Sequence, residues 1–278
     1  MAINRQDYPF VIKIFVLTGV ILQKLSDLSR ACFAGFWLGI LKRETIDLAN
    51  MFVYDKMDMY RKDEYNRSGL FRWEEKMVDK YFQKCKSLLV AGTGGGREVL
   101  ALSRLGYDVD GFECNSDLVE RANEFLKKEG LNSNIHLVPP DQCPDSTKIY
   151  DGLIIGWGVY MHIQGREQRI SFLKKLRSQT REMAPILLSF YFRSESPLYF
   201  RVVATIGNVI RLVLWRDYLE IGDTFLYISD FNQYIHCFAK DEIDFELREG
   251  GFQLDSYCTE EYGHAIGIAS KLSDKIST

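Results

Sequence analysis

The chain has 278 residues, which is enough for one large domain or for one domain with an appended segment. With 46% hydrophobic and 26% charged residues and only 6 prolines, its composition excludes collagen-like, disordered and low-complexity proteins. The 35 basic and 38 acidic side chains leave a net charge of -3. That balance provides no general attraction to nucleic acid, and we expect no nucleic-acid partner.

The first 84 residues are predicted to form an N-terminal helical segment, a cap or an interface, with helices over about 8–29, 31–50 and 70–84. From Val11 to Leu28, apolar residues recur at three- and four-residue steps, the pattern of one apolar helix face. This face predicts packing on the same chain or on a second copy, which would make a homodimer. Peripheral membrane contact is the alternative, because Lys13, Lys24 and Arg30 accompany the face.

The apolar stretches near the N-terminus are too short to span a bilayer, and no cleavage signal follows them. We therefore expect neither a transmembrane segment nor export. The six cysteines form no CxxC pair and no Cys/His spacing typical of zinc, so we expect reduced thiols, no metal site and a cytoplasmic location.

From about residue 85 the pattern changes to short apolar runs that alternate with amphipathic stretches, which is typical of a parallel α/β sheet. A helical insertion over 194–235 follows the fifth strand and is expected to act as a substrate lid over the domain 85–278. The predicted strands are 87–91, 107–113, 134–138, 150–156, 185–192, 252–258 and 264–270, and the helices are 96–105, 116–129, 166–183 and 240–250.

The strongest motif is the segment SLLVAGTGGGREV, in which a buried strand leads through a glycine-rich loop into a helix. Glycines allow a ligand to approach the backbone, and the first turn of the helix offers free N–H groups. Gly92, Thr93, Gly94 and Gly96 are therefore candidate contacts for a nucleotide-like ligand.

Glu113 ends the second predicted strand, where a carboxylate can accept hydrogen bonds from both hydroxyls of a ribose. The loop and this acid alone leave NAD and S-adenosylmethionine (SAM) open. SAM is favoured because Arg97 stands where the dinucleotide fingerprint needs glycine, and because two adjacent strands end the predicted sheet.

With these motifs, the chain resembles the class I SAM-dependent methyltransferases from about residue 70 to 270. The resemblance implies SAM as the cofactor and a Rossmann-like, mostly parallel sheet of seven strands in the order 3-2-1-4-5-7-6, the last antiparallel. It further implies cofactor contacts from Asp141 and Gln142 after the third strand, and from Gly156, Trp157 and Gly158 after the fourth.

One position departs from the family pattern, which has an acid two residues before the first glycine. This chain has Val90 there, so the SAM ammonium must be bound by main-chain carbonyls or by the N-terminal segment. Tyr54, Tyr60, Tyr65 and Asn66 are the candidates in that segment.

Methyl transfer needs alignment and exclusion of water, and a base only if the acceptor arrives protonated. His162, His236 and Tyr160 are the catalytic candidates, and Arg193, Arg166 and His264 are candidates for substrate contact. These residues favour O-methylation of a carboxylate or hydroxyl in a small metabolite or a peptide terminus. The alternatives are an NAD(P)-dependent oxidoreductase and a non-catalytic binding module of the same fold.

Overall fold

The computed structural model describes residues 9–132, 134–193, 198–228 and 230–271. The chain forms two compact units. The first consists of Met1–Lys42 and Ser196–Thr224, and the second of Arg43–Glu195 and Phe225–Thr278.

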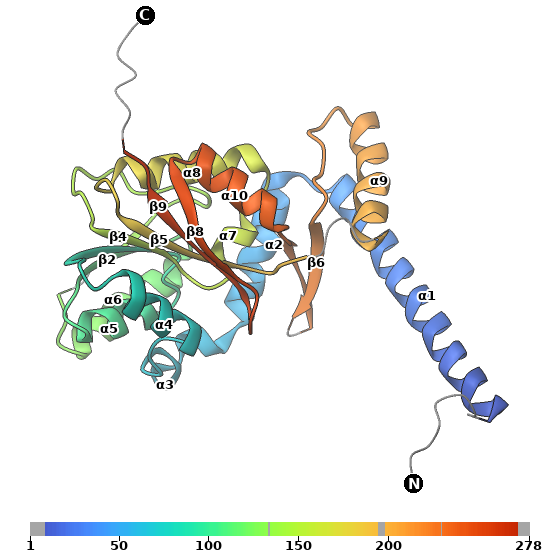
Figure 1. The fold of residues 1–278 in the computed structure, drawn as a ribbon, viewed down its shortest axis with the longest axis horizontal. Helices are drawn as coiled ribbons and strands as arrows, with labels where there is room; N and C mark the ends of the chain where they lie inside the picture. Colours follow the sequence, from blue (N-terminus) through green and yellow to red (C-terminus); the bar gives the residue numbers. More distant parts are fainter. Residues whose placement is uncertain (1–8, 133, 194–197, 229, 272–278) are drawn as a thin grey trace, which may run out of the picture. The chain divides into compact units, whose positions relative to one another are not determined.

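A seven-stranded sheet is the centre of the second unit (Figure 1). Its strand order is β3-β2-β1-β4-β5-β9-β8; β1 to β5 run parallel, and β9 is antiparallel to both of its neighbours. The predicted sheet is therefore confirmed. The strands are β1 (Ser87–Ala91), β2 (Asp108–Glu113), β3 (Ile135–Leu137), β4 (Gly152–Ile155), β5 (Pro185–Phe190), β8 (Phe252–Cys258) and β9 (Gly263–Ala269).

Helices cover both faces of this sheet because its central strands are apolar on both sides. In Figure 1, α4, α5 and α6 lie below the sheet, and α8 and α10 lie above it. Val90, Ile154 and Leu187 form a buried core with residues such as Val99 of α5 and Phe125 of α6. The helices are α4 (Arg72–Tyr81), α5 (Arg97–Arg104), α6 (Ser116–Lys128), α7 (Val159–His162), α8 (Arg166–Ser178) and α10 (Lys240–Glu249).

The part of the second unit that precedes β1 begins with α2 (Arg43–Lys56), followed by the short helices η1 (Asp58–Arg61) and α3 (Asp63–Asn66). Helix α2 packs against β7 (Phe231–His236), which pairs with β6 (Asp223–Ile228) in a separate two-stranded sheet. The sequence predicted a helical insertion over 194–235, of which 194–197 and 229 lie outside the described residues, and the strands at its end are a correction. A two-stranded ribbon depends on packing from elsewhere in the chain, here from α2, which local periodicity does not reveal.

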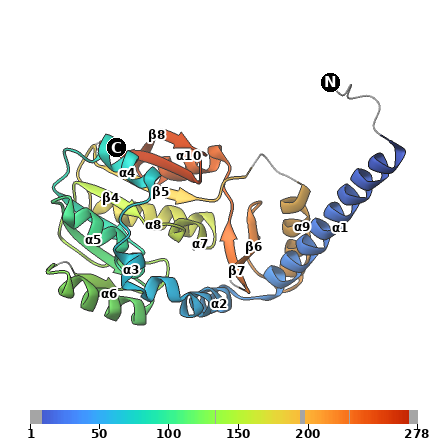
Figure 2. The same ribbon diagram turned by 90° about the horizontal axis from the view of Figure 1, so that it is seen from below.

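The first unit consists of α1 (Phe10–Ile40) and α9 (Leu198–Val213), which lie side by side (Figure 2). Their backbones approach closely at Gly35, where an added Cβ would lie 2.7 Å from the Val203 carbonyl oxygen. The predicted break between helices near residue 30 is wrong, because α1 continues to Ile40. Arg30 is an exposed cation on the helix surface and does not end the helix.

Candidate active site

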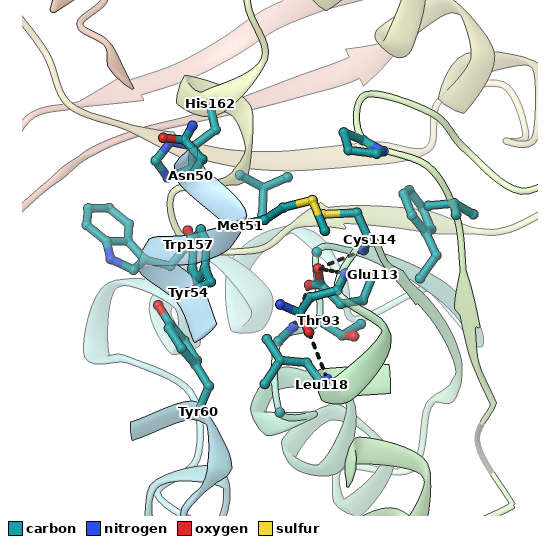
Figure 3. Close-up of a pocket in the computed structure, with 18 of the residues that line it drawn as sticks. Asn50, Met51, Tyr54, Tyr60, Thr93, Glu113, Cys114, Leu118, Trp157 and His162 are labelled. Carbon is teal, nitrogen blue, oxygen red and sulfur yellow. Dashed lines mark hydrogen bonds between the residues drawn. The ribbon is translucent and has the colours of Figure 1, made fainter. Parts of the chain in front are cut away.

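A cavity of about 1110 Å³, counting the space at its open side, lies at the carboxyl ends of β1, β2, β3 and β4. All of its lining residues belong to the second unit. Ligands of open α/β sheets bind at the carboxyl ends of the strands, so this cavity is the candidate ligand site. In Figure 3, Thr93, Glu113 and Leu118 lie on one side of the cavity, and Tyr54, Trp157 and His162 lie on the other.

The predicted glycine loop forms one wall of the cavity. Gly92 and Gly94 have φ values of 67° and 51°, and both line the cavity together with Thr93. A Cβ on Gly92 would lie 2.1 Å from Val159 Cγ2, so only glycine fits there. The buried Thr93 hydroxyl has no hydrogen-bond partner within the described ranges, as expected for a group that a ligand satisfies. Gly96 turns the chain into α5 and does not line the cavity.

Residues before the sheet lie directly on this loop. A Cβ on Gly95 would lie 2.0 Å from the Tyr60 carbonyl oxygen, and that oxygen accepts a hydrogen bond from Asn66 Nδ2 at 3.0 Å. Tyr65 also lines the cavity, and its ring meets that of Tyr60 edge to face at a centroid distance of 5.7 Å. The four candidates predicted in this segment, Tyr54, Tyr60, Tyr65 and Asn66, all line the cavity.

Glu113 holds the loop from the end of β2. Its carboxylate accepts hydrogen bonds from the backbone N–H groups of Gly94 at 3.0 Å, Cys114 at 2.7 Å and Asn115 at 3.0 Å. A carboxylate offers about four acceptor positions, so ribose hydroxyls would join or replace these donors. Burial raises the pKa of the Cys114 thiol, and the Glu113 carboxylate raises it further.

Asp141 and Gln142 also line the cavity, as the sequence predicted. Asp141 has a φ of 60°, and its Oδ2 lies 2.7 Å from Arg43 Nη2. Burial raises the pKa of Asp141, against the opposing effect of Arg43. An adenine amine at this carboxylate would therefore share it with Arg43.

A buried charge cluster follows the glycine loop. Arg97 donates to both carboxylate oxygens of Glu74 at 2.8 and 3.0 Å and to Glu98 Oε1 at 2.5 Å. Glu98 lines the cavity and is 5% exposed; burial raises its pKa, and Arg97 opposes that rise. One guanidinium between two carboxylates leaves the cluster with an excess of negative charge when all three are ionised.

His162 lies on the opposite side of the cavity. Its Nδ1 lies 2.7 Å from the carbonyl oxygen of Tyr234, which can only accept, so Nδ1 carries the proton and the lone pair is on Nε2. Burial lowers the pKa of His162 to about 4, which keeps the ring neutral near neutral pH. Tyr54 meets this ring edge to face at a centroid distance of 5.8 Å.

Strand β7 holds this side of the cavity in place. The Tyr234 N–H donates to Asn50 Oδ1 at 2.9 Å, and the same residue supplies the carbonyl oxygen that holds His162. Both Asn50 and His162 line the cavity, although Tyr234 does not. The backbone of one β7 residue, Tyr234, therefore fixes a side chain from α2 and another from α7.

The structure places the other catalytic candidates outside the cavity. Tyr160 is 1% exposed and donates through its hydroxyl to Glu246 Oε2 at 2.7 Å. His236 is fully buried against Phe238, with ring centroids 4.5 Å apart. Neither side chain reaches the space where a ligand would lie, so a catalytic role for either gains no support.

The three substrate candidates also lie away from the cavity. Arg193 pairs with Glu242 at 2.7 Å, and Arg166 approaches the same carboxylate at 3.3 Å. His264 stacks on Trp73 with ring centroids 5.1 Å apart. Trp157 lines the cavity, whereas Gly156 and Gly158 do not; a Cβ on Gly156 would lie 2.5 Å from the Gly92 carbonyl oxygen.

Sequence reasoning missed several lining residues, above all Glu98 and Asp47. Asp47 accepts a hydrogen bond from Gln164 at 2.6 Å, and its pKa is raised to about 6, first by burial and then by Asp141. Glu98 could have been identified from the sequence, because it is an acid in the first helical turn after the glycine loop. Asp47 could not, because α2 carries no recognisable motif. The other missed residues include Asn50, Met51, Cys114, Asn115 and Leu118.

Comparison with known proteins supports the predicted family. A family model described as tellurite resistance protein TehB matches residues 52–183. A probable SAM-dependent methyltransferase, TehB of Haemophilus influenzae, is 32% identical over 129 residues, covering 46% of this chain and 43% of that protein. The chain thus spans less than half the length of the curated relatives that it matches.

Solved structures of methyltransferases share the fold. A SAM-dependent methyltransferase from Methanosarcina mazei aligns with a TM-score of 0.58 and 17% identity, over 73% of this chain and 99% of that one. The TehB structure from H. influenzae aligns with a TM-score of 0.51 and 19% identity, over 77% and 67% of the two chains. The solved structures confirm the predicted fold, and the TehB matches confirm the resemblance to SAM-dependent methyltransferases over part of the chain.

Proposed function

We propose that this chain, whose fold is that of the class I SAM-dependent methyltransferases, transfers the methyl group of SAM to a hydroxyl of a small acceptor. The acceptor is an uncharged, partly apolar molecule. When bound, SAM supplies a methyl group on a positively charged sulfur, and the residues of the cavity bind, orient and exclude water.

The observation that carries the proposal is the charge of the cavity. Its lining includes the four acids Asp47, Glu98, Glu113 and Asp141 but only one strongly basic side chain, Arg97. An excess of carboxylates attracts a ligand with a sulfonium and an ammonium, and it repels the pyrophosphate of a dinucleotide. Glu98 supports the ammonium site that the family usually builds from the acid replaced here by Val90.

The acceptor side of the cavity is aromatic. Tyr54, Tyr60 and Trp157 line it, and burial raises the pKa of the Tyr54 hydroxyl, which therefore stays protonated. A carboxylate acceptor loses its support because Arg193 and Arg166 lie elsewhere, and the acids of the cavity would repel it. A hydroxyl on a partly apolar molecule fits this wall.

His162 is the proposed proton acceptor, through Nε2. The low pKa of His162 makes it a weak base. The acceptor hydroxyl becomes strongly acidic once its oxygen begins to bond to the methyl carbon, so a weak base is sufficient to take its proton. The hydrogen bond from Nδ1 to Tyr234 fixes the ring in the tautomer that this role requires.

Calorimetric titration with SAM, S-adenosylhomocysteine, NADH and NADPH tests the cofactor. We expect micromolar binding of the first two only. Binding of NADH or NADPH would instead favour the oxidoreductase, and binding of none of the four would favour a non-catalytic module.

Transfer of tritium from methyl-labelled SAM tests the acceptor, with panels of small hydroxyl compounds, amines and carboxylic acids. Tellurite belongs in the same experiment because of the matched family model. We expect label in hydroxyl compounds, and none in tellurite, an oxyanion that the acids would repel. Label confined to amines, carboxylates or tellurite would contradict the hydroxyl assignment without affecting the cofactor.

A further inference from the structure

Helix α1 exposes an uncharged face along its whole length. Its members are spaced by 4, 7, 11, 3 and 4 residues, which places them on one side of a helix. Over 31 residues this side extends for about 46 Å. We call it the outer face, and its members are Val11 (74% exposed), Phe15 (75%), Leu22 (67%), Phe33 (47%), Phe36 (47%) and Ile40 (37%).

Helix α9 packs against the opposite side of α1. Ala31, Ala34 and Leu38 are buried there, next to the close approach of Gly35 to α9. Helix α9 has 16 residues against 31 in α1, so it covers only part of that side. The outer face points away from α9 and is left uncovered.

The two helices are positively charged, although the chain as a whole carries a net charge of -3. The single acid in their 47 residues is Asp27. No charged side chain interrupts the outer face. The basic residues are Lys13, Lys24, Arg30, Arg201 and Arg211.

An exposed tryptophan follows α9. Trp215 is 95% exposed and has a φ of 53°, a conformation that bulky residues rarely adopt. Neither burial nor backbone preference explains a tryptophan at this position. Tryptophan is enriched at membrane interfaces, where its ring contacts both lipid and water.

We propose that the α1–α9 unit attaches the protein to the surface of an anionic phospholipid bilayer, with α1 in the plane of the interface and its outer face toward the acyl chains. No helix within the described ranges is long and apolar enough to cross a bilayer. An uncharged face with lysines and arginines on the other sides of the helix is the pattern of helices that lie in the interface. Two copies packed through α1 would bring together helices of the same charge, whereas anionic headgroups neutralise it.

Flotation of the full chain with phosphatidylcholine vesicles, with and without phosphatidylglycerol, tests this proposal. We expect binding that requires the anionic lipid. Phe15→Ser and Leu22→Ser should each weaken binding about tenfold, because each removes a large apolar side chain from the lipid contact. The matched controls Leu105→Ser and Met183→Ser, at exposed apolar positions of the second unit, should leave it unchanged.

Charge and fluorescence give two further readouts. Lys13→Gln, Lys24→Gln and Arg30→Gln should each weaken binding about fivefold, and added salt should act in the same direction. Tryptophan emission should shift to the blue on vesicle binding, and Trp215→Phe should remove most of that shift. Circular dichroism of each variant shows that α1 and α9 still form.

Two outcomes would overturn the proposal. Wild-type protein that stays unbound with anionic vesicles excludes a lipid surface as the partner. A dimer in light scattering that Phe15→Ser converts to a monomer, without any vesicle binding, assigns the outer face to a second copy instead. Neither outcome depends on the proposed methyl transfer.

Discussion

In the proposed function, the ammonium of SAM binds at Glu98. It is 5% exposed, lines the cavity and shares Arg97 with Glu74. We expect Glu98→Gln to weaken binding of SAM and S-adenosylhomocysteine at least about tenfold in calorimetry, because the negative charge opposite the ammonium is lost. Methylthioadenosine, which has no ammonium, should bind the variant as it binds the wild type.

The control for this prediction is Glu75→Gln, an exposed acid on α4. It should bind all three ligands normally. An equal loss of affinity for methylthioadenosine in Glu98→Gln would show that the substitution disturbs the loop itself and would remove the ammonium assignment.

His162 gives a prediction about pH. Its folded pKa of about 4 lies below the ordinary value of 6.5, so the unfolded state binds the proton more readily. The associated stability is complete above pH 6.5 and is lost as the pH falls toward 4, by up to about 3 kcal/mol. Urea unfolding of wild type and His162→Gln should therefore converge as the pH falls.

The same pKa can be measured directly. Proton NMR of the four histidines should show one resonance, absent in His162→Gln, that does not titrate above about pH 5. A titration midpoint near pH 6.5 for this resonance would mean that the His162 ring is solvated. It would contradict the assignment of His162 as a neutral base.

Sequence motifs predicted the positions of single site residues only where the motif lies within a short stretch of the chain. Gly92, Gly94 and Glu113 were identified because a strand, a tight turn and the end of the next strand determine their places. Arg193 and Arg166 were expected in the site because a guanidinium suits a substrate carboxylate. Glu242 of α10 pairs with both, and that pairing is not visible in the sequence.

At the scale of the elements, the contact between the segment 58–66 and the glycine loop leaves no room for an added methyl group. In Gly95→Ala, the new methyl group would lie 2.0 Å from the Tyr60 carbonyl oxygen and must displace the segment. We expect a loss of about 1–3 kcal/mol in urea unfolding, together with faster tryptic cleavage at Arg61 and Lys62.

Gly19→Ala is the matched control because nothing lies within 4 Å of its added Cβ. Alanine inside α1 should stabilise that helix by up to about 1 kcal/mol. Gly95→Ala with unchanged stability and cleavage would mean that the segment does not rest on the loop.

Helix and strand boundaries followed the local pattern well where one face of an element is buried. The predicted strands 87–91 and 252–258 agree with β1 and β8, and the helix 240–250 agrees with α10 to one residue. The join inside α1 and the strands β6 and β7 were missed. In both cases, contacts with a distant segment decide the structure.

At the scale of the whole molecule, the cavity belongs to one unit. All of its lining residues lie in 43–195, and none lies in α1 or α9. We expect SAM to slow hydrogen exchange in peptides that cover 58–66 and 92–98 and to leave peptides from α1 and α9 unchanged.

Hydrogen exchange measured by mass spectrometry distinguishes this expectation from the hypothesis that the insertion 194–235 acts as a lid. Slower exchange in α9 on addition of SAM would show that the insertion closes over the cofactor. Unchanged exchange in both units would mean that SAM does not bind in this cavity.

The sequence by itself determined the strands of the seven-stranded sheet, the glycine loop after the first strand and the position of Glu113 at the end of the second. Each of these strands and turns depends on residues that are close together in the chain, where spacing and backbone conformation are local properties. Tertiary structure decided which candidate side chains meet. The site of His162 depends on a carbonyl of β7, and the charge of the cavity depends on burial of Glu98 beside Arg97. These relations join residues through burial and hydrogen bonds, which no spacing along the chain encodes.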